Sequence, residues 1–363
     1  MSPAVGNKIH VRVLLAANVV ASVEILPRVR PPLARMFTGK EPSAVLNVMP
    51  RLFALCAAAQ QTALVSAIET ARDEVTALAT QQHRIALIVI ERIVDLARGL
   101  FVGHLTLNVA SAAAIRSLMS ELSAFGRSAQ TARGYPQREV TGRIVAALAT
   151  LGVWEGGGFR PSSPLALCAA ALNEDGLMSN PTAHPFLSAA DDPDITKRLL
   201  RDDPTFCYCP DLEGHVPETG PWARQMTRDP LSPKPFGAVE RLTARIVEII
   251  RLCAWLAAGA RVDTAEHGII GTYKLGPGRA AAAVECARGR LYHAVELDAQ
   301  GRISRFEFLA PTEWNFHRRG PLVRNLKGAA LTAQRRRDAV HAVIASLDPC
   351  VGFTLDFREF HDA

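Results

Sequence analysis

The stretch LYHAVELDAQGRISRFEFL, residues 291–309, decides the fold class. Residues 291–297 and 303–309 are short runs rich in apolar residues, which is typical of strands. Between them Asp298-Ala299-Gln300-Gly301 predicts a hairpin turn. A further strand is predicted at 281–286, directly before this hairpin. The chain therefore contains a small antiparallel sheet.

A second hairpin is predicted near the start of the chain. Residues 10–15 and 19–26 alternate like strands, and Ala16-Ala17-Asn18 can form the turn between them. The prolines of residues 27–32 end this hairpin.

Helices dominate the rest of the sequence. Residues 44–154 are rich in Ala and Leu with apolar residues at helical spacing, and helical periodicity returns at 237–260 and 332–347. Residues 155–235 are rich in Gly, Pro and Asp, which predicts mostly loop with short elements. We therefore expect an α+β fold, mainly a helical bundle with small antiparallel sheets.

This organisation predicts one large domain over residues 1–363. Its expected parts are an N-terminal hairpin (1–43), a helical bundle (44–154), a loop-rich segment (155–235), and a part with helix, hairpin and a C-terminal metal half-motif (236–363).

Composition excludes several functional classes. The net charge of +6 is modest, and the basic runs Arg335-Arg336-Arg337 and His317-Arg318-Arg319 lack interleaved aromatics, so we expect no nucleic-acid partner. No leader peptide or membrane span is expected, because no run is both long and apolar enough. The 7 cysteines form no disulfide framework, which indicates reduced thiols in the cytoplasm.

Two half-motifs suggest metal chemistry. Asp348-Pro349-Cys350-Val351-Gly352-Phe353 reads like D-P-C-x-x-C with its second cysteine replaced by phenylalanine. Arg51-Leu52-Phe53-Ala54-Leu55-Cys56 reads like R-x-C-x-x-C with its first cysteine replaced. Each keeps one thiolate, a soft metal ligand. Cys56 and Cys350 are therefore candidate ligands in a protein that handles a metal fragment without holding a complete two-metal centre.

The other cysteines have simpler interpretations. Cys207-Tyr208-Cys209 with His215 allows a zinc knuckle, but we favour ordinary loop cysteines because no second pair lies nearby. Cys168 and Cys253 lie in Ala/Leu-rich helical segments and look like core residues. Cys286, close to Arg288 in sequence, is the best candidate for a third thiol near the site.

Five elements occur in the order found in [NiFe]-hydrogenase large subunits, and the chain resembles that family over most of its length. They are the Arg51…Cys56 half-motif, Gly220-Pro221-Trp222-Ala223-Arg224 (like G-P-L-A-R), Glu285-Cys286-Ala287-Arg288-Gly289 with His293 (like E-A-P-R-G…H), Pro311-Thr312-Glu313-Trp314-Asn315 (like P-T-x-W-N), and Ser346-Leu347-Asp348-Pro349-Cys350. The resemblance implies the large-subunit fold.

The departures from that family are equally informative. Phe53 stands in place of a nickel-only cysteine and Phe353 in place of a bridging one. The R-x-E-G-H glutamate has no counterpart around Lys8-Ile9-His10, and two expected histidines are Gln60 and Asp356. The resemblance therefore implies no active hydrogenase and no stoichiometric nickel.

This combination is similar to the hydrogenase expression/formation proteins of the HupK or HoxV type. That family implies a non-catalytic scaffold that assists assembly or transfer of an Fe(CN)2(CO) fragment, held transiently. It also implies three partners: a HypC-type chaperone, a HypD-type assembly protein, and the hydrogenase large subunit as recipient.

The resemblance gives four residues a role. Cys56 and Cys350 would supply sulfurs, while Arg288 would hydrogen-bond cyanide and lower the thiolate pKa, with Asp348 bracing that arginine. Each also has a structural interpretation: core cysteines, a core ion pair, and a turn after the last helix. Trp314 and Asn315 are expected to be structural.

Two other functional classes remain open. One is a diverged redox subunit, either a hydrogen sensor or a quinone-site subunit of the complex I type. The retained cysteine in each half-motif speaks against the complex I version. The other is a structural interaction protein whose half-motifs are relics. Infrared bands of bound cyanide and carbon monoxide would separate these classes.

Overall fold

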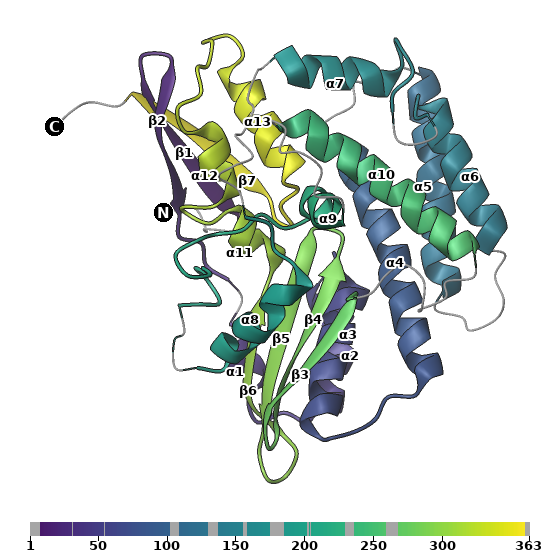
Figure 1. Ribbon diagram of the computed structural model, residues 1–363, viewed down its shortest axis with the longest axis vertical. Helices are drawn as coiled ribbons and strands as arrows, with labels where there is room; N and C mark the ends of the chain where they lie inside the picture. Colours follow the sequence, from purple (N-terminus) through teal and green to yellow (C-terminus); the bar gives the residue numbers. More distant parts are fainter. Residues whose placement is uncertain are drawn as a thin grey trace.

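The computed structural model describes residues 8–30, 32–53, 55–101, 109–129, 137–154, 158–174, 185–201, 203, 205–228, 236–258 and 268–359. They form an α+β fold with a four-stranded sheet, a three-stranded sheet and a layer of long helices (Figure 1). The predicted fold class is confirmed. No helix in these ranges has both the length and the apolar character needed to cross a membrane.

The four-stranded sheet is an antiparallel meander. Its order is β3 (Ile270–Gly276), β4 (Arg279–Cys286), β5 (Gly289–Leu297) and β6 (Ile303–Leu309). The last three strands and the Asp298 turn lie where the sequence predicts them, and Asp298 Oδ1 accepts the Arg302 N–H at 2.9 Å. β3 was not predicted.

Both faces of this sheet are covered, which explains the alanine-rich β4. Ala280 and Ala282 face a core formed with α1 (Leu33–Phe37), α2 (Pro42–Leu52) and α3 (Ala57–Ala71). Ala281 and Ala283 face α8 (Asp192–Leu199) on the other side. Small side chains let a helix approach each face closely, because successive residues of a strand point to opposite faces.

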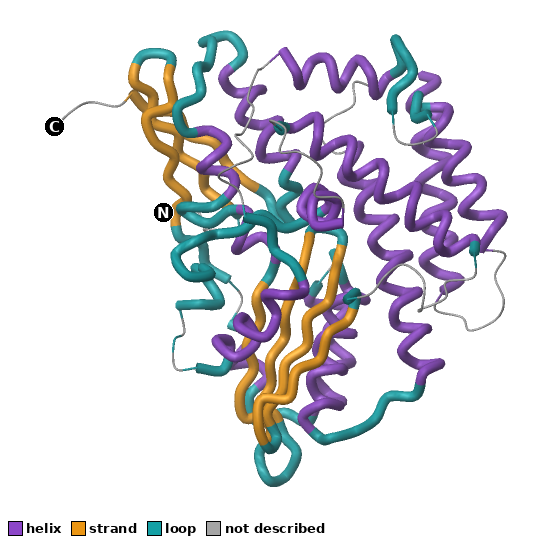
Figure 2. Tube along the Cα trace, viewed as in Figure 1, coloured by secondary structure: helices purple, strands orange, loops and turns teal. Residues whose placement is uncertain are grey.

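The long helices gather on one side of the molecule (Figure 2). They share an apolar core, and this layer consists of α4 (Leu78–Phe101), α5 (Val109–Ala129), α6 (Gln137–Thr150), α7 (Pro164–Glu174) and α10 (Ala238–Ala257). Within the described residues, the helices predicted over 44–154 and 237–260 are thus present; residues 54, 102–108, 130–136 and 259–260 lie outside them.

The three-stranded sheet joins the two ends of the chain. β1 (Ile9–Ala16) pairs antiparallel with β2 (Val19–Leu26), as predicted, and parallel with β7 (Phe353–Glu359). The expectation of purely antiparallel sheets was therefore wrong here. β7 places the second half-motif at the edge of the core.

Short helices connect this sheet to the rest: α11 (Pro311–Asn315), α12 (Pro321–Leu326) and α13 (Arg336–Ser346). α13 is shorter than the predicted 332–347. It ends because Asp348 has φ of 48°, a left-handed conformation that stops a helix.

The loop-rich segment 155–235 contains α7, α8, α9 (Pro221–Arg228) and a 3-10 turn at Ala189–Asp191. Residues 155–157, 175–184, 202, 204 and 229–235 of this segment lie outside the described residues.

Candidate metal centre

A cavity of about 290 Å³ lies where the two half-motifs meet. Cys56, Cys350 and Arg288 all line it, although they are far apart in sequence, and Cys286 lines it as well. Asp348 lies behind the wall, where its carboxylate pairs with Arg288. The fold thus brings together all four residues singled out from the sequence.

Arg288 sits in a two-residue turn between β4 and β5, since Cys286 and Gly289 form the last pair of the two strands. Gly289 has φ of 130°, and a Cβ there would lie 2.2 Å from Thr219 Oγ1, so only glycine fits.

Arg224, from the Gly220–Arg224 motif, holds this turn in place. Its Nη1 donates to the Cys286 carbonyl at 3.1 Å and its Nη2 to the Ala287 carbonyl at 3.0 Å. Glu248 on α10 orients Arg224 through contacts of 2.8 and 2.7 Å. Burial opposes the charge of Glu248, yet Arg224 and Arg92 lower its pKa, so it stays ionised. Two hydrogen-bonded carbonyls therefore position the turn in which Ala287 replaces the proline of the E-A-P-R-G pattern.

The Arg288 guanidinium contacts groups from three elements. Nη1 lies 3.1 Å from Asp95 Oδ2 and 3.4 Å from Cys56 Sγ, and Nε lies 3.3 Å from Asp348 Oδ2. Burial disfavours its charge, but Asp348, Cys56 and Asp95 together raise its pKa. Arg288 is therefore a fixed cation, and its Nε makes no hydrogen bond of good geometry.

Asp348 has two buried arginines near it, because Arg245 on α10 lies close to it as well as Arg288. Gly99 on α4 leaves the space for this: a Cβ there would lie 3.0 Å from Arg245 Nη1 and 3.2 Å from Asp348 Oδ2. Burial lowers the pKa of Arg245, and its Nη1 has no hydrogen-bond partner among the described residues.

Cys56 begins α3 in a left-handed conformation, with φ of 58°. Its N–H donates to Asp95 Oδ2 at 3.2 Å, while the Ala58 and Ala59 N–H groups donate to Glu91 at 2.7 and 3.0 Å. Two carboxylates one turn apart on α4 thus satisfy the first N–H groups of α3. The sequence analysis did not predict this role of Glu91 and Asp95.

The expected lowering of the Cys56 pKa is not found. A hydrogen bond with Cys286 and complete burial raise the pKa of Cys56 well above its usual range, and Arg288 offsets this only in part. Without a metal, Cys56 is therefore a thiol at neutral pH. Metal binding must displace its proton.

The two phenylalanines of the half-motifs do different things. Phe53 lines the cavity and packs edge-on against Phe308, with ring centroids 6.0 Å apart. Phe353 begins β7, pairs with Ile9 and packs on His341. The cavity wall is aromatic where a fourth sulfur would be needed. A four-thiolate nickel centre does not fit these residues.

Gln60, which replaces an expected histidine, also lines the cavity. Its Oε1 lies 2.5 Å from Nε2 of His293 on β5. Burial lowers the pKa of His293 to about 3. This pair is therefore neutral, with the imidazole proton on Nε2.

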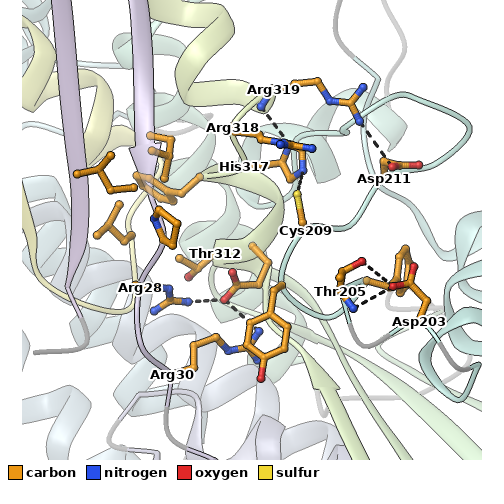
Figure 3. A pocket seen from close by; sticks show the side chains of 18 of the residues that line it. Arg28, Arg30, Asp203, Thr205, Cys209, Asp211, Thr312, His317, Arg318 and Arg319 are labelled. Carbon is orange, nitrogen blue, oxygen red and sulfur yellow. Dashed lines mark hydrogen bonds and ion pairs between the residues drawn. The ribbon is translucent and has the colours of Figure 1, made fainter. Parts of the chain in front are cut away.

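A second cavity of about 560 Å³ adjoins the first (Figure 3). The two share Arg28, Arg30, Thr312 and Glu313 as lining residues. Thr312 Oγ1 lies 3.1 Å from Cys350 Sγ, so Cys350 lies near the shared wall.

The cysteines of the C-x-C sequence meet different partners. Cys209 Sγ lies 2.7 Å from His317 Nε2 in the second cavity (Figure 3), whereas Cys207 contacts Glu307. His215 instead pairs with Leu212. Within the described part of the chain, no three His, Cys, Asp or Glu side chains form a group that could hold a metal ion. Cys207, Cys209 and His215 thus each have a different partner.

Comparison with solved structures defines the class. The chain has the fold of the nickel–iron hydrogenase large subunit: it superimposes on the Ni-Fe-Se hydrogenase of D. vulgaris Hildenborough with a TM-score of 0.60 and 12% identity, over 93% of this chain and 94% of that one. No protein-family model matches the sequence.

Comparison with curated proteins is more specific. The chain is 49% identical to the hydrogenase expression/formation protein HupK of Bradyrhizobium diazoefficiens, over 99% of both chains. It is 32% identical to HupK of Rhizobium leguminosarum bv. viciae, over 91% of both. The chain belongs to the HupK family of hydrogenase expression/formation proteins.

Proposed function

We propose that this chain is a non-catalytic hydrogenase maturation factor. It serves as a scaffold on which an Fe(CN)2(CO) fragment is assembled, or from which the fragment passes to a hydrogenase large subunit. The observation that supports this most directly is the single cavity lined by Cys56, Cys350 and Arg288. The names of its relatives, which are expression/formation proteins, support the maturation role.

The chemistry of the cavity suits this cargo. Iron that carries cyanide needs soft sulfur donors and hydrogen-bond donors for the cyanide nitrogens. Thiols supply the first, and the buried Arg288 cation supplies the second. Apolar side chains such as Phe53, Leu291 and Phe308 form most of the remaining lining.

The missing nickel ligands favour a carrier over a redox subunit. With Phe53 in the wall, the site lacks the sulfurs that retain nickel. Fewer thiolates also bind more weakly, which suits a protein that must release what it holds. Stoichiometric nickel in the purified protein would instead support the redox class.

The second cavity supports an anionic cargo as well. Five arginines line it, against three acids: the arginines are Arg28, Arg30, Arg198, Arg318 and Arg319. Positive clefts concentrate anions. We propose a HypC-type chaperone, a HypD-type assembly protein and the hydrogenase large subunit as partners in this transfer.

Infrared spectroscopy tests the proposal. The protein is co-expressed with the assembly machinery and purified anaerobically, and we expect cyanide and carbonyl bands that disappear in Cys56→Ala. Cys253→Ala is the matched control, because Cys253 is equally buried but does not line the cavity. Absent bands, together with intact hydrogenase maturation in Cys56→Ala and Cys350→Ala strains, would overturn it.

A further inference from the structure

Cys286 lies beside Cys56. It ends β4, and α3, which begins directly after Cys56, packs against that strand. Both line the 290 Å³ cavity, and both belong to the same core cluster. Arg224 fixes Cys286 through its carbonyl, and Asp95 fixes Cys56 through its N–H. Each sulfur is therefore held by its own backbone anchor.

Cys350 has a different environment. Its sulfur contacts the Thr312 hydroxyl at 3.1 Å, at the wall shared with the second cavity. Among the described residues, no three potential metal ligands are grouped closely enough to hold one ion. The described residues therefore do not assemble a site with three sulfurs.

We propose that Cys56 and Cys286 form a two-sulfur site for a soft metal or metalloid centre that brings its own remaining ligands. This rests on, and deepens, the proposed function, because an iron that already carries three diatomic ligands needs few protein donors. Cys350 is not the partner of Cys56 in this site.

The position of Arg288 fits a dithiolate. Its Nη1 lies 3.4 Å from Cys56 Sγ, and it is the residue that follows Ala287 in the turn after Cys286. Arg288, which also pairs with Asp95 and Asp348, offsets part of the charge that appears when the thiols lose their protons.

Phenylarsine oxide is a suitable probe, because arsenic that carries a phenyl group binds two thiols. Two As–S bonds form, the oxygen leaves as water with both thiol protons, and no electrons are transferred. The experiment uses full-length, iron-free protein in a Cys209→Ser background, so that Cys207 and Cys209 cannot act as a competing pair. Iodoacetamide and peptide mass spectrometry then show which thiols are protected.

We expect one equivalent of arsenic per chain, with Cys56 and Cys286 protected and Cys350 still alkylated. Cys56→Ser and Cys286→Ser each lose the chelate, which weakens binding by about 100-fold. Cys253→Ser, the matched buried control, binds like the parent. Cys286→Ala repeats the test with a second side chain, and far- and near-UV circular dichroism confirms that each variant is folded.

Protection of Cys56 together with Cys350, or unchanged binding by Cys286→Ser, would overturn the two-sulfur site. Because the probe needs no iron, these outcomes are independent of the infrared test. If the protein binds arsenic at Cys56 and Cys286 but never shows cyanide bands, the two-sulfur site is supported and the proposed iron cargo is not.

Discussion

Cys56 combines two features that rarely occur in one residue. It is a candidate metal ligand, and its backbone is left-handed although it carries a side chain. Such a conformation costs a non-glycine residue about 1–2 kcal/mol. It persists because Asp95 holds the Cys56 N–H and Glu91 holds the next turn. Strain maintained in this way is typical of functional positions.

This strain predicts an unusual order of stabilities. Cys56→Gly and Cys56→Ala lose the same sulfur, but only glycine tolerates the left-handed backbone without cost. We expect Cys56→Gly to be more stable than Cys56→Ala by about 1 kcal/mol in urea unfolding.

The control for this prediction lies one helical turn further on. Ala59 is buried within α3, so Ala59→Gly should destabilise the protein by about 1 kcal/mol. If Cys56→Gly is no more stable than Cys56→Ala, the backbone at Cys56 is not left-handed in solution.

At the scale of elements, the contact between α3 and α4 carries a pH dependence. Burial raises the pKa of Glu91 to about 7, against the lowering effect of the Ala58 and Ala59 N–H groups. The folded protein therefore keeps a proton on Glu91 between the unfolded value near 4.5 and about 7. The contribution of Glu91 to the free energy of unfolding therefore falls as the pH rises through that window. Above about pH 7 it stays constant.

Glu91→Gln should remove this dependence. Between pH 5 and 8 we expect the wild type to lose roughly 2–3 kcal/mol of unfolding free energy that the variant does not lose. Guanidinium unfolding at several pH values measures the difference. Glu139→Gln on α6, an exposed change, should leave the slope as in the wild type. Parallel slopes for wild type and Glu91→Gln would contradict the shifted pKa.

The sequence could predict those parts of the fold that have local signals. Two apolar runs and a turn predict the hairpin at 291–309. The two half-motifs indicate Cys56 and Cys350 as candidate ligands. β7 also alternates, with Phe353, Leu355 and Phe357 on one face, and was missed because its start was interpreted only as a broken metal motif.

The missing parts of the site depend on contacts between distant residues. Asp95 meets Arg288 across 193 positions, and no local pattern marks it as a partner. The sequence gives only a weak indication of Asp95, which is a carboxylate with apolar neighbours in a long helix. The raised pKa of Cys56 likewise follows from burial beside Cys286, which only the packing of α3 on β4 creates.

At the scale of the whole molecule, β7 holds the second half-motif in place. The Ile9 N–H donates to the Gly352 carbonyl at 2.9 Å, and Arg12 pairs with Asp356 at 3.1 Å. Asp356, which replaces an expected histidine, lies within this paired strand.

Removing residues 353–363 should therefore disturb the 290 Å³ cavity that Cys350 lines. We expect a lower melting temperature, by roughly 5 °C or more, since β1 loses its parallel partner and an apolar face is exposed. We also expect faster alkylation of Cys350 by iodoacetamide. Removing only residues 360–363 is the control, because these follow β7. Equal melting and equal Cys350 reactivity in both truncations would contradict an anchoring role for β7.

The pairing of β1 with β7 also sets an order of events during synthesis. His10 and Thr354 are hydrogen-bonded partners separated by 344 positions. Closing so long a loop is slow compared with forming a local hairpin. While the ribosome is still translating the middle of the chain, β1 and β2 can pair, but Cys350 does not yet exist. The cavity is therefore completed only after β7 has emerged, and a ribosome-bound, partly made chain has no finished site to load.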